Sequence, residues 1–178
     1  MYRDNTLIPT EAIRLAALGS LVEGDTGYAA LASEIRFFVA HIAGPSLDLL
    51  GTSLELLGYE GLAETLDGAA MEGDAILRVT DAGWAAFHSL MISNVRAPVG
   101  DVGKLIVALK LRFLHLLPAE ERLDQTDMLI EMCELERARL SEMRGRYTDG
   151  SLANWLDLDI AQIEERLVWF QRELPAGG

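Results

Sequence analysis

The residues that most often carry out chemistry in proteins are few in this chain and far apart in the sequence. Cys133 is the only cysteine, and the three histidines lie on separate predicted helices, at His41, His88 and His115. No pair of these residues has the spacing of metal ligands. The chain also has no glycine-rich phosphate loop, no Gly-x-Ser-x-Gly elbow and no pair of carboxylates with a catalytic spacing. These patterns predict a protein that is not an enzyme and that binds no metal or cofactor.

Contact with nucleic acid is the other chemistry that the sequence offers. Serine and threonine hydroxyls can bond to base edges or phosphates, and arginines can pair with phosphates. The DNA-binding candidates are Ser46, Thr52 and Ser53 in one predicted helix, together with Arg14, Arg36 and Arg78. Arg14 and Arg36 lie in earlier helices, where an ordinary surface ion pair explains each of them equally well.

The three hydroxyl candidates lie in a leucine-rich segment that predicts a helix. One face of this helix carries leucines spaced three, four and three residues apart, at Leu47, Leu50, Leu54 and Leu57. Ser46 can cap the start of the helix, because its hydroxyl can accept a hydrogen bond from a free backbone N–H. Gly61 can adopt the left-handed conformation that ends it.

A β-hairpin is expected directly after this helix. Two short apolar runs, Leu62 to Leu66 and Ala75 to Thr80, have the length of strands, and the polar stretch Asp67 to Asp74 between them is typical of a hairpin tip. Two further helices are predicted before the leucine-rich one, from Pro9 to Gly24 and from Tyr28 to Ile42. Three helices followed by a hairpin is the order of a winged helix-turn-helix.

The same segment resembles the PadR family of transcriptional regulators, and its AphA-like members in particular. In that family the third helix leads through an acidic-Gly-Leu turn to a strand that ends in Leu-Thr-Glu-x-Gly. The matching residues here are Leu54, Leu57, Glu60-Gly61-Leu62 and Val79-Thr80-Asp81-Ala82-Gly83. The chain departs from the pattern at Gly51, where the family has tyrosine, at Thr52, where it has proline, and at Leu56, where it has a basic residue. The resemblance implies a DNA-binding regulator whose dimer places two reading helices on successive major-groove faces.

The fold class predicted is mainly α with a small β-hairpin, in two domains. The stretch Arg96 to Gly103 contains proline and glycine and predicts a boundary, with a winged helix-turn-helix domain over 1–96 and an all-helical dimerisation domain over 97–178. In the last predicted helix, Asn154 to Leu174, apolar residues recur every three or four positions, at Leu156, Ile160, Ile163, Leu167, Phe170 and Leu174. This period of 3.5 residues is typical of a seam between two helices, so we predict that these residues join a homodimer.

The distribution of charge supports a second interpretation. The net charge is −13, and the residues up to Met91 include four arginines and 13 acidic residues. No Lys or Arg occurs between Arg36 and Arg78, although cations near phosphates supply much of the affinity of proteins for DNA. The alternative is therefore a winged-helix interaction module that has lost DNA binding and docks a basic protein partner.

Composition sets the remaining expectations. A single cysteine is typical of a reducing cytoplasm. The first ten residues lack the apolar core of a signal peptide, and the longest apolar-rich run, Leu105 to Leu117, is too short and too charged to span a bilayer. We therefore predict a cytoplasmic protein with no membrane contact. A small-molecule effector is compatible with either interpretation, but no residue pattern indicates one.

Overall fold

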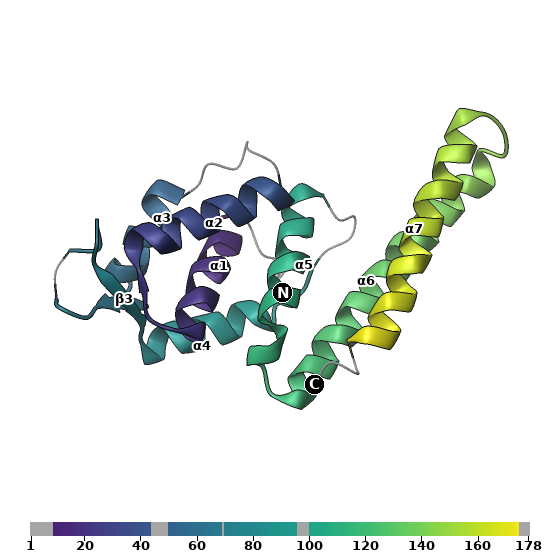
Figure 1. Ribbon diagram of the computed structural model, residues 1–178. Helices are drawn as coiled ribbons and strands as arrows, with labels where there is room; N and C mark the ends of the chain where they lie inside the picture. The colour runs from purple at the N-terminus through teal and green to yellow at the C-terminus, as the bar shows by residue number, and fades with distance from the viewer. Residues whose placement is uncertain (1–8, 44–49, 69, 96–99, 175–178) are drawn as a thin grey trace, which may run out of the picture. The chain divides into compact units, whose positions relative to one another are not determined.

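The computed structural model describes residues 9–43, 50–68, 70–95 and 100–174. Its elements in chain order are α1 (Pro9–Glu23), β1 (Thr26–Gly27), α2 (Tyr28–Ile42), α3 (Leu50–Tyr59), β2 (Ala63–Thr65), β3 (Ile76–Val79), α4 (Asp81–Met91), α5 (Asp101–Phe113), the 3-10 turn η1 (Leu114–Leu116), α6 (Ala119–Arg146) and α7 (Ser151–Glu173). Figure 1 shows these elements along the chain. The fold is mainly α with a small antiparallel sheet, which confirms the predicted class.

The chain forms two compact units. The first comprises residues 1–94 and 100–114, and the second comprises residues 95–99 and 115–178. The helix α5, which the predicted boundary assigned to the C-terminal domain, lies in the first unit and packs on α1 and α2. The difference arises because the glycine-rich stretch marks a break in secondary structure, whereas the unit is defined by the apolar face that α5 buries.

The first unit is built around α1. This helix packs against α2, α3, α4, α5 and β3, and its middle is apolar on every side. Small residues allow the neighbours to approach closely: a Cβ added at Gly19 would lie 2.4 Å from the ring of Phe113 in α5. A helix that is hydrophobic all round is expected at the centre of a core, and α1 occupies that position.

The sheet of the first unit has three short strands in the order β1-β3-β2. Both outer strands pair antiparallel with β3, Thr26 of β1 opposite Leu77 and Ala63 of β2 opposite Val79. The hairpin of β2 and β3 confirms the two strands predicted from sequence. The sequence analysis missed β1, because two residues carry no alternation that could distinguish a strand from a turn. The chain order is helix, strand, two helices and a hairpin, and β1 lies beside β3. This is a winged-helix arrangement in which the β2–β3 hairpin is the wing.

Arg112 joins α5 to two other helices. Its guanidinium forms ion pairs with Glu34 of α2, and with Glu23 of α1 at 3.8 Å. The same group lies 5.4 Å from the ring centre of Phe38 and 4.9 Å from that of Phe113. Arginine suits such a site because its flat, weakly hydrated cation can stack on rings and pair with carboxylates at once. These contacts hold α5 within the first unit.

Lys110 is the most unusual buried residue of this core. Its side chain is fully buried, and its ammonium donates a hydrogen bond to the backbone carbonyl of Met91 at the end of α4. The negative C-terminal end of the α4 dipole also stabilises a cation at this point. Burial disfavours the charged form and lowers the pKa of Lys110 from 10.5 to about 7.

The second unit is an antiparallel hairpin of two long helices, α6 and α7, which lie side by side in Figure 1. The apolar seam predicted in the last helix is real, and its partner is α6 of the same chain. Four of its residues are buried within the single chain, namely Leu156, Ile163, Leu167 and Phe170, whereas Ile160 and Leu174 are half-buried. The facing residues of α6 include Leu129, Met132, Cys133 and Leu140. A side chain buried in this way has little surface left for a second copy, so the seam forms the core of the hairpin.

The burial of Lys110 predicts a specific pH dependence of stability. The unfolded chain holds this proton up to pH 10.5, whereas the folded chain releases it near pH 7, so the unfolded state binds more protons between these values. The free energy of unfolding should therefore rise with pH across this window, by up to about 1.4 kcal/mol per pH unit. Lys110→Met should lack this rise. Urea unfolding of both proteins at pH 7, 8 and 9 measures the difference, and parallel pH profiles would contradict it.

Candidate nucleic-acid interface

The helix α3 holds the position of a reading helix in the winged-helix arrangement. Leu54 and Leu57 are buried and attach it to the core, while Glu55 and Leu56 between them are exposed. Ser46 lies outside the described residues, and of Thr52 and Ser53 only the backbone, in α3, is described. The side chains that face outward from the described part of α3 are therefore acidic or apolar near its C-terminal end.

The end of α3 is fixed by a Schellman motif. The N–H of Leu62 donates to the carbonyl of Leu57 at 2.8 Å, and the N–H of Gly61 donates to that of Gly58 at 3.0 Å. Gly61 has a φ of 69°, which is costly for any residue with a Cβ, so glycine at this position allows the chain to turn out of the helix into β2. The predicted helix end is confirmed.

Thr80 joins this turn to the end of the wing. Its hydroxyl donates to the carbonyl of Gly61 at 2.7 Å and accepts from the N–H of Gly83 at 3.0 Å, and its own N–H donates to the carbonyl of Leu62 at 3.1 Å. One threonine thus caps the N-terminus of α4 and binds the C-terminal turn of α3. The two ends of the wing meet at this residue.

Gly83 is required at the same junction. A Cβ added there would lie 1.9 Å from the carbonyl oxygen of Leu62 and 2.8 Å from a methyl group of Val79. Real Cβ atoms do not approach backbone oxygens so closely, so α4 can pack against the turn only because residue 83 has no side chain. The glycine therefore allows α4 to lie directly against the base of the wing.

Two of the three candidate arginines are engaged in ion pairs within the first unit. Arg14 of α1 pairs with Glu60 at the end of α3, at 2.7 Å. Arg78 of β3 forms two hydrogen bonds with Asp25, which precedes β1, at 2.9 Å from Nε and 2.5 Å from Nη2. The hydrogen bonds from Arg78 lower the pKa of the Asp25 carboxyl below its usual value. Both pairs join residues about 50 positions apart in the sequence, which is why sequence analysis identified the arginines but not their partners.

Arg36 differs from the other two arginines. It lies on α2 and is exposed, and it forms no ion pair or hydrogen bond with any described residue. Arg14 and Arg78 are each held by a carboxylate, whereas Arg36 has no such partner among the described residues. Of the three, Arg36 has the guanidinium most available to a phosphate.

Comparison with known proteins decides the family. The chain matches, over residues 2–174, the model of a family described as a putative AphA-like transcriptional regulator. The chain belongs to this AphA-like family. A search of curated proteins found no match.

The residues that carry the resemblance in this AphA-like chain have structural roles. Gly61, Leu62, Thr80 and Gly83 all lie at the junction of α3, the wing and α4. Within the described part of the chain, no group of three or more His, Cys, Asp or Glu residues could hold a metal ion, and no helix is long and apolar enough to cross a membrane.

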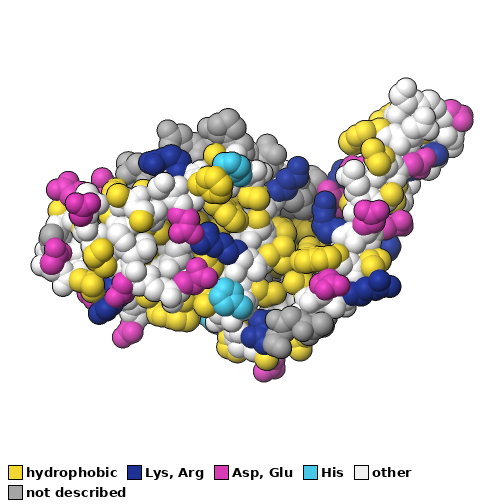
Figure 2. Space-filling model, viewed as in Figure 1, with side chains coloured by type: hydrophobic (Ala, Val, Ile, Leu, Met, Phe, Trp, Pro, Cys, Tyr) yellow, Lys and Arg dark blue, Asp and Glu magenta, His cyan; other side chains and the backbone are white. Residues whose placement is uncertain are grey.

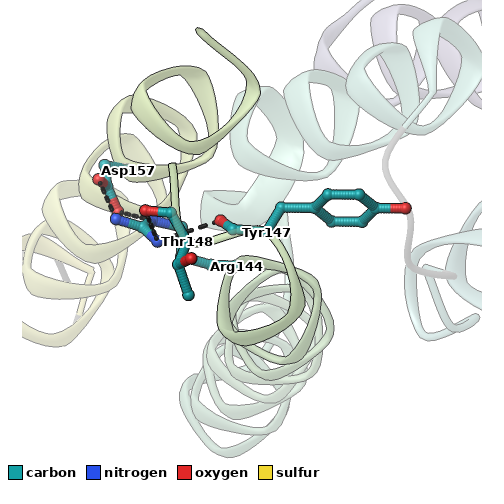
Figure 3. Close-up of polar contacts among 4 residues, drawn as sticks. All are labelled: Arg144, Tyr147, Thr148 and Asp157. Carbon is teal, nitrogen blue, oxygen red and sulfur yellow. Dashed lines mark hydrogen bonds and ion pairs between the residues drawn. The ribbon is translucent and has the colours of Figure 1, made fainter. Parts of the chain in front are cut away.

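The helical hairpin ends in a turn that Arg144 holds in place. Figure 3 shows its guanidinium bound to both carboxylate oxygens of Asp157 in α7, at 2.7 and 3.0 Å. It also donates to the backbone carbonyls of Tyr147 and Thr148, at 3.1 and 3.2 Å. These bonds satisfy carbonyls at the end of α6 and fix the register in which α7 returns along α6.

A second apolar face of α7 points away from its seam. Trp155, Leu158 and Trp169 are 53%, 57% and 45% exposed, and their spacing of three and then 11 residues places them on one helical face. Figure 2 shows hydrophobic side chains at the surface of the hairpin. Exposed apolar residues that gather on one face usually mark an interaction surface.

Gly83→Ala should destabilise the protein strongly. The new methyl group would overlap a backbone carbonyl, which cannot rotate away, so we expect a loss of at least about 2 kcal/mol in the free energy of unfolding. Gly24→Ala is the matched control, because no atom lies within 4 Å of its added Cβ. Its effect should stay within about 0.5 kcal/mol. Chemical denaturation of the two variants measures the contrast, and equal stabilities would refute the role given to Gly83.

Proposed function

We propose that this AphA-like protein is a cytoplasmic transcriptional regulator, without catalytic activity, that binds double-stranded DNA as a homodimer. The observation that carries the proposal is the winged-helix arrangement of the first unit, in which α3 and the wing meet at Thr80. Membership of a family of transcriptional regulators supports it. In this account α3 enters the major groove and the wing lies beside the DNA backbone.

The charges of the described surface limit how the DNA is held. Arg36 can bind a phosphate directly, whereas Arg14 and Arg78 must exchange a carboxylate partner for one. Contacts from these three cations in each chain would neutralise about six phosphates in a dimer. The slope of log K against log salt from these contacts should therefore be about −5, the low end for a protein that binds DNA. Specificity must come largely from base contacts and from the pairing of two half-sites.

DNA binding can be tested by fluorescence anisotropy with the promoter region of the protein's own gene at low salt. We expect a Kd tighter than about 1 μM, which is the strong end of non-specific binding. Arg36→Ala should weaken binding and reduce the salt slope by about two, one phosphate for each chain of a dimer. Arg146→Ala, which removes an exposed cation at the end of α6, is the control and should change neither quantity. The absence of binding near 1 μM would refute DNA recognition and favour the interaction module.

The homodimer is proposed to form through the exposed face of α7 rather than through its seam. The seam residues are already buried against α6, while Trp155, Leu158 and Trp169 present apolar surface with no cover within the described chain. Tryptophan is also enriched at the energetic centres of interfaces. Burying this face against a second copy would remove it from water.

Leu158→Asp and Ile163→Asp should separate the two faces of α7. Leu158→Asp places a charge on the exposed face, so the mass in solution should fall from twice the 19.5 kDa of one chain to that of a monomer, with helix content unchanged. Ile163→Asp places it inside the hairpin and should reduce the helix content itself. Light scattering and circular dichroism report these outcomes. A Leu158→Asp protein that stays dimeric would show that the interface lies elsewhere.

A further inference from the structure

A groove lies between the end of α3 and the wing. Its volume is about 640 Å³, within the range of small-molecule sites, which is about 300–1,000 Å³. The end of α3, the strand β2 and the tip of the wing each contribute to its lining. Met71 of the wing tip packs over Gly58 of α3, where an added Cβ would lie 2.7 Å from the sulfur atom. The absence of a side chain at Gly58 thus lets the wing close one side of the groove.

The groove is acidic and has an exposed aromatic ring. Glu55 of α3, Glu64 of β2 and Glu72 of the wing tip line it, and no Lys or Arg is among its described lining residues. Tyr59, also in the lining, is 88% exposed. Arg78 lies opposite Glu64 in the sheet, and its guanidinium is bound to Asp25 and also interacts electrostatically with Glu64. Glu55 and Glu72 are therefore the lining carboxylates without this cation beside them. Figure 2 shows acidic side chains over the end of the first unit that carries the wing.

The form of this groove selects a class of ligand. A carboxylate and an ammonium group that meet at an exposed site attract one another weakly, so a ligand with one positive charge would gain little. Three carboxylates on three separate elements favour a ligand with several ammonium groups along a chain. The methylene groups of such a chain can pack on Met71, and one ammonium can lie over the ring of Tyr59.

We propose that this groove binds an aliphatic polyamine, and that the bound polyamine neutralises the face that α3 and the wing present to DNA. The second part rests on the proposed function. By linkage, the factor by which the bound polyamine raises the affinity for DNA equals the factor by which DNA raises the affinity for the polyamine. In this proposal the acidic surface of α3 and the wing does not mean that DNA binding is lost. It means that a polyamine must bind as well.

Isothermal titration calorimetry with spermidine and the full chain at low salt, without DNA, tests the site directly. We expect saturable binding at one site in each chain. The double variant Glu55→Gln/Glu72→Gln should bind about tenfold more weakly. The control Glu131→Gln/Glu164→Gln changes the net charge equally on exposed positions of α6 and α7 and should bind like the wild type. No saturable binding, or equal weakening in both variants, would overturn the site.

Anisotropy with promoter DNA tests the coupling separately. Spermidine should raise the affinity for DNA of the wild type and of the Glu131→Gln/Glu164→Gln control. This increase should be several-fold larger than the increase for the Glu55→Gln/Glu72→Gln groove variant. An equal effect on all three proteins would place the action of spermidine on the DNA and overturn the coupling. If none of the three proteins binds DNA, the proposed function fails, and the calorimetric result still decides whether the groove is a polyamine site.

Discussion

The backbone carbonyl of Leu62 is the point on which the first unit depends. It accepts a hydrogen bond from the N–H of Thr80, and it lies so close to Gly83 that no side chain fits between them. Because the N–H of Leu62 also closes the C-terminal turn of α3, this one residue fixes the helix, the base of the wing and the start of α4 together. The residues that carry the resemblance therefore form a rigid junction between α3, the wing and α4.

Much of this arrangement could be predicted from the sequence, because its signals are local. The periodic leucines and the glycine that ends α3 each act within a few residues. Features that depend on distant partners were missed or misassigned. The strand β1 is defined by its pairing with Leu77 in β3. The ion pairs of Arg14 with Glu60 and of Arg78 with Asp25 join residues that are distant in the sequence. The α7 seam correctly indicated burial, but a repeat cannot show whether the covering helix comes from the same chain.

The fold and the proposed function make different demands on surface charge. A winged helix needs no particular surface charge, whereas DNA binding does. Here Arg14 and Arg78 are paired with carboxylates, and the groove beside α3 carries three more acidic residues. Such a surface can approach a duplex only if two copies act together or if a cation covers the carboxylates. We propose dimerisation through α7 and polyamine binding beside the wing as the two ways in which this chain meets that requirement.

The central claim is that α3 and the wing, locked together at Leu62, form the surface that meets DNA. Amide chemical-shift mapping of the isotope-labelled protein during titration with its own promoter DNA tests this most directly. The account predicts that the largest shifts fall in α3 and in the wing between β2 and β3, while the seam of the α6–α7 hairpin stays unchanged. Shifts confined to the hairpin, or to α2 and α5 without α3, would contradict it.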